Sequence, residues 1–324
     1  MVDVSVGTFN LNNLFSRFNF QGEIKAVRNL ETSLDSDVAY SFLETDTWRV
    51  RTYKGKLVKA KKSKEIDWIA ERIKRIDVDV LAIQEAEDLD TLRMFNRYNL
   101  DRMYEHVVLI EGNDTRLIDV GVLSKFPIGG VTSWRYAVHP NNPKKLVFGR
   151  DLLQVEILNR SRSKTLFTLF NNHLKSNYVD FRDDPVTAKQ KNDTRRTQQA
   201  EIVAKIVKAE TRPDSRYIIL GDMNNSPHSP CLQPFTRDPG LNLSNALLNP
   251  QETRPARKDT PPPTSTAWTH RYKKRGQPAD YELYDQIWIS SKLKSRQKEA
   301  WIDRRKRHGG DGSDHDPAWI TLSL

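Results

Sequence analysis

The chain has 324 residues, of which 37% are hydrophobic and 29% charged, a balance that provides a sizeable core and excludes a long disordered polypeptide. Its 52 Lys and Arg residues outnumber its 42 Asp and Glu residues, and the formal net charge of +10 favours polyanionic partners such as nucleic acid or an anionic membrane. The single cysteine, Cys231, excludes an intramolecular disulfide and a zinc site built of several thiolates.

The first residues lack the basic and apolar parts of a signal peptide, and no apolar run approaches the length that spans a membrane. We therefore expect a cytoplasmic protein with no membrane partner. Secretion is the alternative if a leader precedes this sequence, and the sequence allows no deduction of a protein partner.

Hydrophobic periodicity predicts the first elements in chain order. An alternating strand is expected at 4–11 and ends among amide side chains. The periodicity then fades over about 16–64, where lysines accumulate, so we predict a basic surface insertion there. Apolar residues at helical spacing predict an amphipathic helix at 65–76, which leads into a buried strand at 78–83.

The middle of the chain contains short apolar runs with few helical patterns between them, so antiparallel pairing is expected. These predicted strands are 106–110, 120–123, 152–158 and 166–170. A second amphipathic helix is expected at 194–209 and leads into a strand at 217–220.

The C-terminal part begins with a Pro-rich segment at 249–265, which predicts a long surface loop. Strands are expected after this loop at 267–269, 283–289 and 318–322. The chain shows no internal repeat, and its strands and helices would fit two packed sheets covered by helices. We assign them to a single domain over residues 1–324.

Polar side chains recur at or near the ends of these predicted strands. They are Asn10, Glu85, His173, Asp222 with Asn224, Asp285, and Asp314 with His315. Because strand ends in a layered fold can converge, this set can supply what phosphodiester hydrolysis requires: ligands for a cation, a base for water, and donors to the phosphate oxygens.

The residue types suit that chemistry. Glu85 and Asp314 offer hard carboxylate oxygens, which favour Mg²⁺ or Mn²⁺. The amides of Asn10 and Asn224 can orient water or phosphate without adding negative charge. Histidines exchange protons near neutral pH, so the two in this set could transfer a proton or donate to the phosphate.

Seven motifs occur in order along almost the whole chain. They are Thr8-Phe9-Asn10-Leu11-Asn12, Ile83-Gln84-Glu85, Gly121-Val122-Leu123-Ser124-Lys125-Phe126-Pro127-Ile128, Asn172-His173-Leu174-Lys175-Ser176, Gly221-Asp222-Met223-Asn224, Tyr284-Asp285-Gln286-Ile287 and Ser313-Asp314-His315-Asp316-Pro317. In this order the motifs resemble those of the endonuclease/exonuclease/phosphatase superfamily, typified by pancreatic deoxyribonuclease. The resemblance implies an α+β fold, a four-layer α/β-β/α sandwich of two packed, mainly antiparallel sheets, with the active site at one sheet edge.

The resemblance also implies metal ligands. Glu85, Asp314 and Asn12 occupy the corresponding positions, and Mg²⁺ or Mn²⁺ is the implied cofactor. Asn12 stands where apurinic endonucleases carry an aspartate. This departure argues against a second metal and against a specialised abasic-site enzyme.

By the same resemblance, the catalytic residues are His173, Asp222, Asn224, Asp285 and His315. Asp285 is expected to hydrogen-bond His315, and this pair either activates water or holds the phosphate; Asp222 is the competing candidate for the base. Asn224 would fix the nucleophile or the leaving side, and His173 would assist the leaving group.

Four residues are assigned to substrate binding: Asn10, Lys175, Arg195 and Arg196. The basic ones look like phosphate contacts in a bacterial nuclease-like branch of the superfamily. Arg195 and Arg196 sit near the start of the helix expected at 194–209, so a solvated or capping role is equally open.

Two basic clusters, at 271–275 and 304–307, precede the last two motifs, so their loops could border the cleft. They could neutralise flanking phosphates, and Tyr272 could stack a base. The alternative is a solvated basic loop.

Together the motifs and the charge predict a Mg²⁺- or Mn²⁺-dependent nuclease that acts by direct attack of water on phosphorus. DNA is the expected substrate, and RNA is the further candidate. The alternative is a phosphodiesterase or phosphatase acting on a lipid or inositol-phosphate headgroup, which would require an apolar rim. A remote alternative is a nucleic-acid-binding protein without catalysis, which would leave the acid, amide and histidine set unexplained.

Overall fold

The computed structural model describes residues 2–16, 52–53, 56–57, 60–179, 182–255, 262–306 and 311–324. Most of the basic insertion expected at 16–64 therefore lies outside the described residues. The short strands β2 (Thr52–Tyr53) and β3 (Lys56–Leu57), which fall within it, pair antiparallel.

The first sheet has seven strands in the order β14-β18-β19-β1-β4-β6-β5. Their bounds are Gln251–Glu252 for β14, Gln297–Ile302 for β18, Ala318–Ser323 for β19, Asp3–Leu14 for β1, Val80–Ala86 for β4, Asp119–Ser124 for β6 and His106–Leu109 for β5. The β1–β4 and β14–β18 pairs are parallel, and the other neighbours are antiparallel.

The second sheet has six strands in the order β13-β17-β12-β11-β10-β7. Their bounds are Ser244–Asn245 for β13, Asp285–Ile289 for β17, Tyr217–Asp222 for β12, Thr165–His173 for β11, Leu152–Leu158 for β10 and Ile128–Ser133 for β7. Among these described strands only β11 and β12 pair in parallel. The prediction of mainly antiparallel sheets is confirmed.

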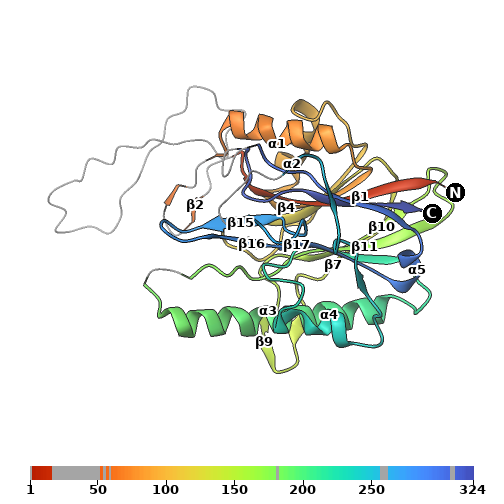
Figure 1. Ribbon diagram of the computed structural model, residues 1–324. Coiled ribbons are helices and arrows are strands. Elements are labelled where there is room, and N and C mark those ends of the chain that lie inside the picture. Colours follow the sequence, from red (N-terminus) through yellow and green to blue (C-terminus); the bar gives the residue numbers. More distant parts are fainter. Residues whose placement is uncertain are drawn as a thin grey trace, which may run out of the picture.

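The two sheets pack face to face, with helices on their outer faces (Figure 1). Helices α1 (Ser63–Ile76) and α2 (Leu89–Tyr98) cover the first sheet, and α3 (Pro185–Glu210) and α4 (Gln233–Arg237) cover the second. The predicted four-layer sandwich is therefore confirmed.

Strand β1 shows how the sequence produces these layers. Because successive side chains of a strand point to opposite faces, Val4 and Val6 enter the core between the sheets. Phe9 and Leu11, at odd positions, instead pack under the helices of the first sheet. Both faces of β1 are thus buried, as expected for a central strand of a four-layer fold.

Two short hairpins and two short helices complete the described fold: β8 (Val138–His139) with β9 (Asn142–Leu146), β15 (His270–Lys273) with β16 (Ala279–Glu282), the 3-10 helix η1 (Pro230–Leu232), and α5 (Ser291–Lys294). In the described part of the chain, no helix combines the length and apolar character needed to cross a bilayer.

Several element predictions were wrong. Helix α3 begins at Pro185 and not at 194, because Asp184 caps it by accepting a hydrogen bond from the Thr187 N–H, and Pro185 occupies the first turn. The residues at 267–269 form no strand, since β15 begins at His270. Helix α2 and strand β18 were not predicted, and β14 lies within the expected loop at 249–265.

Candidate active site

Strand register places the predicted site residues side by side. In the second sheet, His173 of β11 is paired with Asp222 of β12, and Asp222 is paired with Asp285 of β17. In the first sheet, Asn10 of β1 is paired with the residue before Glu85 on β4. The Asn10 side chain joins the two sheets, because its Nδ2 donates to Asp222 Oδ2 at 2.9 Å.

Asp222 is almost completely buried at this junction. Its Oδ1 accepts a hydrogen bond from the Asn224 backbone N–H at 2.8 Å, and its Oδ2 lies 3.4 Å from His173 Nε2 and 3.9 Å from His315 Nε2. Burial raises the pKa of Asp222 to about 6, against the opposing effect of His315 and with further help from the Asp285 charge.

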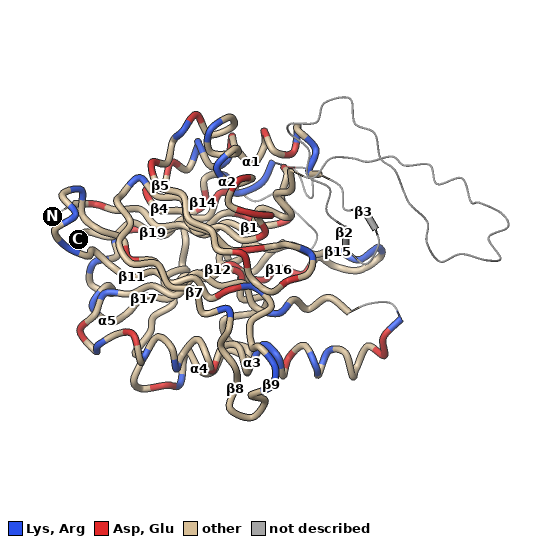
Figure 2. Tube along the Cα trace, turned by 180° about the vertical axis from the view of Figure 1, so that it is seen from behind, with Lys and Arg blue, Asp and Glu red and all other residues tan. Residues whose placement is uncertain are grey.

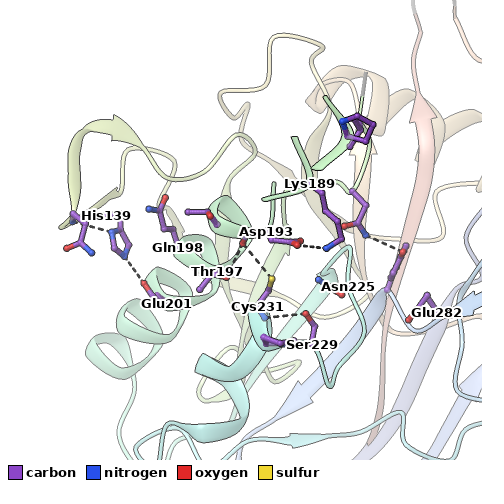
Figure 3. A pocket seen from close by; sticks show the side chains of 17 residues that line it. His139, Lys189, Asp193, Thr197, Gln198, Glu201, Asn225, Ser229, Cys231 and Glu282 are labelled. Atoms are coloured by element: carbon purple, nitrogen blue, oxygen red, sulfur yellow. Dashed lines mark hydrogen bonds and ion pairs between the residues drawn. The ribbon is translucent and has the colours of Figure 1, made fainter. Parts of the chain in front are cut away.

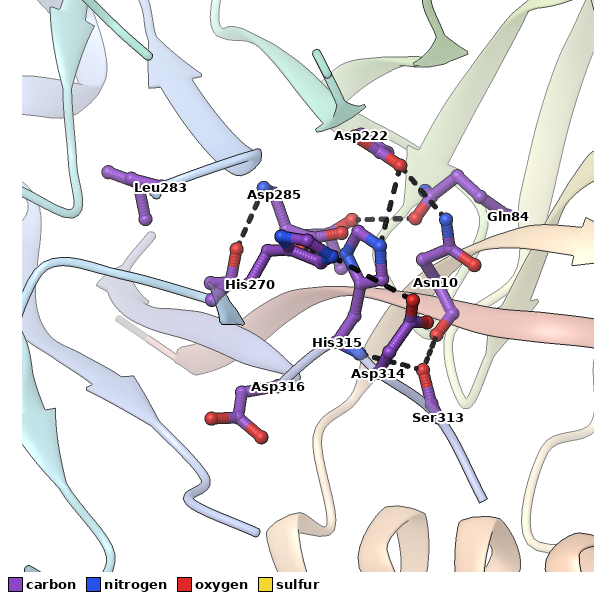
Figure 4. Close-up of polar contacts among 12 residues, drawn as sticks. Asn10, Gln84, Asp222, His270, Leu283, Asp285, Ser313, Asp314, His315 and Asp316 are labelled. Atoms are coloured by element: carbon purple, nitrogen blue, oxygen red, sulfur yellow. Dashed lines mark hydrogen bonds and ion pairs between the residues drawn. The ribbon is translucent and has the colours of Figure 1, made fainter. Parts of the chain in front are cut away.

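His315 is held from both its ring and its backbone (Figure 4). The ring Nδ1 of His315 lies 2.7 Å from Asp285 Oδ2, and the backbone N–H of His315 donates to Ser313 Oγ at 3.0 Å. The Ser313 hydroxyl in turn donates to the Asn10 carbonyl at 2.7 Å, which ties this loop to β1. Burial alone would lower the pKa of His315, but Asp285, Asp222 and the neighbouring Asp314 raise it to about 10.

The other histidine has the opposite electrostatic environment. His173 is buried, and its Nε2 lies 3.9 Å from Glu85 Oε1. Burial, followed by the positive charges of Arg150 and His315, holds the pKa of His173 well below its usual range. His173 is therefore a neutral hydrogen-bonding group at neutral pH.

The predicted metal ligands lie on one wall of the site. Glu85 has a backbone φ of 64°, and Asn12 and Asn13 also have left-handed backbones, with φ values of 47° and 61°. Such conformations are costly for non-glycine residues and are concentrated at functional sites. Glu85 Oε2 accepts a hydrogen bond from the Asn13 N–H at 3.0 Å, which fixes the carboxylate.

The donor chemistry fits a hard divalent cation. Glu85, Asp314 and Asn12 line the same cavity and offer carboxylate and amide oxygens. Burial would raise the pKa of Asp314, but His270 and His315 hold it well below its usual range, so this carboxylate is ionised at neutral pH. Among the described residues, ligand atoms of His270, Asp314 and His315 also lie within 4.8 Å of one another, as do those of Asp222, Asp285 and His315.

These residues surround a cavity of about 800 Å³. Eight of the twelve predicted site residues line it: Asn10, Asn12, Glu85, His173, Asp222, Asn224, Asp314 and His315. Asp285 lies behind the ring of His315. Lys175 is half-buried outside the lining, where its N–H donates to Gln199 Oε1 at 2.8 Å.

The structure does not bring Arg195 and Arg196 into this cavity, and it places both inside helix α3 and not near its start. The side chain of Arg196 is completely buried and donates to Asn177 Oδ1 at 2.6 Å, to Asp193 and to the Lys175 carbonyl. Arg195 donates to the Leu146 carbonyl. The physical reason is that both guanidinium groups are occupied by protein acceptors.

The second basic cluster also differs from expectation. Arg304 and Arg305 are buried and pair with Asp316, at 3.3 Å and 3.0 Å. They stabilise the loop that carries His315 and do not face solvent. The end of this cluster, residue 307, lies outside the described residues.

Several cavity residues were missed by the sequence reasoning. Arg116 and Arg150 line one wall and share Asp114, at 3.0 Å and 3.3 Å. His270 and Tyr284 line another wall, with rings stacked at a centroid distance of 4.9 Å. Tyr284 directly precedes Asp285 in a recognised motif and could have been found there, whereas isolated arginines and a histidine in a basic hairpin carry no comparable signal.

The acid, amide and histidine groups at the edge of the sheet sandwich are of the types that hydrolysis of a phosphoester bond requires. The model of the endonuclease/exonuclease/phosphatase family matches residues 7–315, and the chain belongs to this family. Members of this family act on phosphoester bonds and generally depend on a divalent metal. The resemblance seen in the sequence is thereby confirmed at the level of the family.

Solved structures show the same fold. An endonuclease/exonuclease/phosphatase protein from Bacteroides vulgatus is 14% identical with a TM-score of 0.61, and each chain is covered completely. An AP endonuclease from Archaeoglobus fulgidus is 16% identical with a TM-score of 0.57, covering 99% of this chain and 100% of that one. TDP2 from C. elegans is 15% identical with a TM-score of 0.54, covering 99% of this chain and 75% of that one. No curated protein matches the sequence.

Proposed function

We propose that the protein is a Mg²⁺- or Mn²⁺-dependent nuclease that hydrolyses nucleic acid by direct attack of water on phosphorus. DNA is the first candidate substrate and RNA the second. The observation that supports this most is the line Asp285–His315–Asp222, in which Asp285 fixes the His315 ring and His315 Nε2 lies 3.9 Å from a buried carboxylate at the cavity. A donor and a base thus stand next to each other where a phosphate can enter.

In this proposal Asp222 is the general base and His315 the phosphate donor. Three carboxylates keep the His315 imidazolium charged, so it is a poor proton acceptor and a good donor to a nonbridging oxygen. Asp222, oriented by Asn10 and by the Asn224 N–H, accepts the proton of the attacking water.

Glu85 and Asp314, with Asn12, would hold the divalent cation, which neutralises the phosphate and stabilises the leaving oxygen. The neutral His173 would hydrogen-bond on the leaving side, between Glu85 and Asp222, without itself carrying the proton. Asn224 would help to hold the nucleophile next to Asp222.

The lining of the cavity favours a polar polymer over a lipid. Val179 is its only aliphatic residue among the described ones, and its lining includes Arg116 and Arg150. A lipid headgroup enzyme would need an apolar surface for the acyl chains. The same metal chemistry on inositol phosphates remains the second candidate, since that substrate is also a compact polyanion.

The test uses purified, chelator-treated protein with supercoiled plasmid, then with sphingomyelin and inositol phosphates, each with and without Mg²⁺ or Mn²⁺. We expect metal-dependent nicking that EDTA abolishes. Glu85→Gln and His315→Ala should each lower the rate by roughly 100-fold or more, because each removes charge stabilisation of the transition state. His228→Ala, an exposed histidine outside this cavity, is the matched control. Full activity in both site variants would refute the assignment.

A further inference from the structure

A second cavity of about 1050 Å³ adjoins the candidate active site. The two cavities share Asn177, Val179, Glu282 and Tyr284, so they lie side by side, and we refer to them together as the groove. From the catalytic residues the groove follows helix α3 to His139, whose Nε2 lies 2.7 Å from Glu201 (Figure 3). A polymeric substrate cleaved in the first cavity has space to continue into the second.

The second cavity is chemically unsuited to a row of phosphates. Its carboxylates, Asp193, Glu201 and Glu282, outnumber its one lysine, Lys189, which is itself paired with Asp193 at 2.5 Å. Its other walls carry mainly neutral amides and hydroxyls: Asn141, Asn177, Gln198, Asn225, Thr197 and Ser229. Such groups can hydrogen-bond the edges of bases, which are accessible in an unpaired strand.

Exposed aromatic rings stand at the mouth of the active cavity. Tyr178 and Tyr272 line it with 69% and 57% of their surface exposed, so much of each ring is open to a ligand. Tyr284, shared by both cavities, presents a third ring, backed by His270. Aromatic rings bind unpaired bases by stacking, whereas the bases of a duplex are already stacked on one another.

Basic residues lie beside these rings, whereas the one lysine among the described residues that line the second cavity is paired with Asp193. Tyr272 is on β15, and the turn between β15 and β16 carries the exposed Lys274 and Arg275. Figure 2 shows basic residues at the tip of this hairpin, at the end of the sandwich, whereas β16 carries Asp280 and Glu282. The hairpin can therefore contact the backbone of a strand whose bases rest on the tyrosines.

Building on the proposed nuclease activity, we propose that the groove binds nucleic acid as a single, unpaired strand. Tyr178 and Tyr272 stack bases at the mouth of the active cavity, and the amide-lined second cavity holds nucleotides on one side of the scissile phosphate. The preferred substrate is then single-stranded DNA or an unpaired segment, and duplex DNA is bound less tightly.

The test is fluorescence anisotropy with a labelled single-stranded oligonucleotide and with the matched duplex, in EDTA so that no cleavage occurs. Wild-type protein is expected to bind the single strand at least 10-fold more tightly. Tyr178→Ala and Tyr272→Ala should each weaken single-strand binding by roughly 5- to 100-fold, the range for loss of one stacked base. The Phe variants keep the ring and should bind like wild type.

Tyr98→Ala and Tyr136→Ala are the matched controls, because these tyrosines are 65% and 67% exposed but line neither cavity. Equal or tighter binding of the duplex by wild-type protein, or unchanged binding in both Ala variants of the mouth, would overturn the inference. An active nuclease that prefers duplex would refute this inference alone. A chain that binds single strands but cleaves nothing would refute the proposed function alone.

Discussion

The carboxylate of Asp222 lies at the point where side chains of both sheets meet. Burial and the charge of Asp285 favour its neutral form, whereas His315, Asn10 and the Asn224 N–H favour the ionised form. The balance gives a pKa of about 6, which lets one carboxylate be ionised at neutral pH and still accept a proton during catalysis.

The first prediction is a bell-shaped pH profile. Below about pH 6 Asp222 gains a proton and cannot act as base, so kcat/KM should rise with pH through this value. Above about pH 10 His315 loses its proton and its ability to donate, so the rate should fall. Plasmid nicking measured from pH 5 to pH 10 at saturating Mg²⁺ checks the acid limb and the onset of the alkaline limb.

The variant Asp285→Asn tests the alkaline limb of the pH profile, which we assign to His315. The Asp285 carboxylate raises the pKa of His315, so its removal should lower that pKa and move the alkaline limb toward neutral pH. The acid limb should persist at a somewhat lower pH, because the Asp285 charge also raises the pKa of Asp222. An alkaline limb at the same pH in Asp285→Asn would contradict the role given to His315.

Helix α1 supports the site through a buried arginine. Arg72 donates to Asp303 at 2.9 Å and to Asp316 at 2.8 Å, and it also donates to the His315 carbonyl at 3.2 Å. These contacts join the helix to the end of β18 and to the loop that carries His315. The position of His315 is thus set partly by a helix that contributes no residue to the proposed catalytic set.

The second prediction concerns this network. Arg72→Met should lower the free energy of unfolding by roughly 3 kcal/mol, because it leaves buried carboxylates short of a partner. Lys74→Met on the same helix breaks only the exposed ion pair with Asp101. This variant should change the free energy of unfolding by less than about 1 kcal/mol. Urea unfolding of both variants is the measurement. Equal losses of unfolding free energy in the two variants would contradict a stabilising role of the buried network.

Charge is distributed unevenly at the scale of the whole molecule. The β15–β16 hairpin and helix α5 lie at opposite ends of the sandwich in both views (Figures 1 and 2). Both carry lysines, but only the hairpin borders the candidate active site. The net charge of +10 favours polyanionic ligands, and the hairpin is where we expect that charge to act on the proposed nucleic-acid substrate.

The third prediction is a salt dependence assigned to the hairpin. Single-strand binding should weaken by roughly 10-fold or more between 50 and 200 mM salt, as expected for a few phosphate contacts. Lys274→Ala with Arg275→Ala should flatten this dependence. Lys292→Ala with Lys294→Ala, on α5, should leave it unchanged; the reverse result would place the phosphate contacts elsewhere.

The sequence by itself determined the fold class and eight of the twenty residues that line the cavity. The motifs lie at the ends of strands, and the pairing of neighbouring strands brings those ends together. His173, Asp222 and Asp285 become neighbours in this way. The assignment of residues 1–324 to one domain stays a prediction.

Only the tertiary structure decided which charged groups face the cavity. Arg196 and Arg304 look like solvent-exposed phosphate contacts in the sequence, yet both are buried among carbonyl and carboxylate acceptors. Arg116, Arg150 and His270, which carry no motif, line the cavity. The physical reason is that the role of an arginine depends on which acceptors lie near its guanidinium group, and these come from segments distant in the sequence.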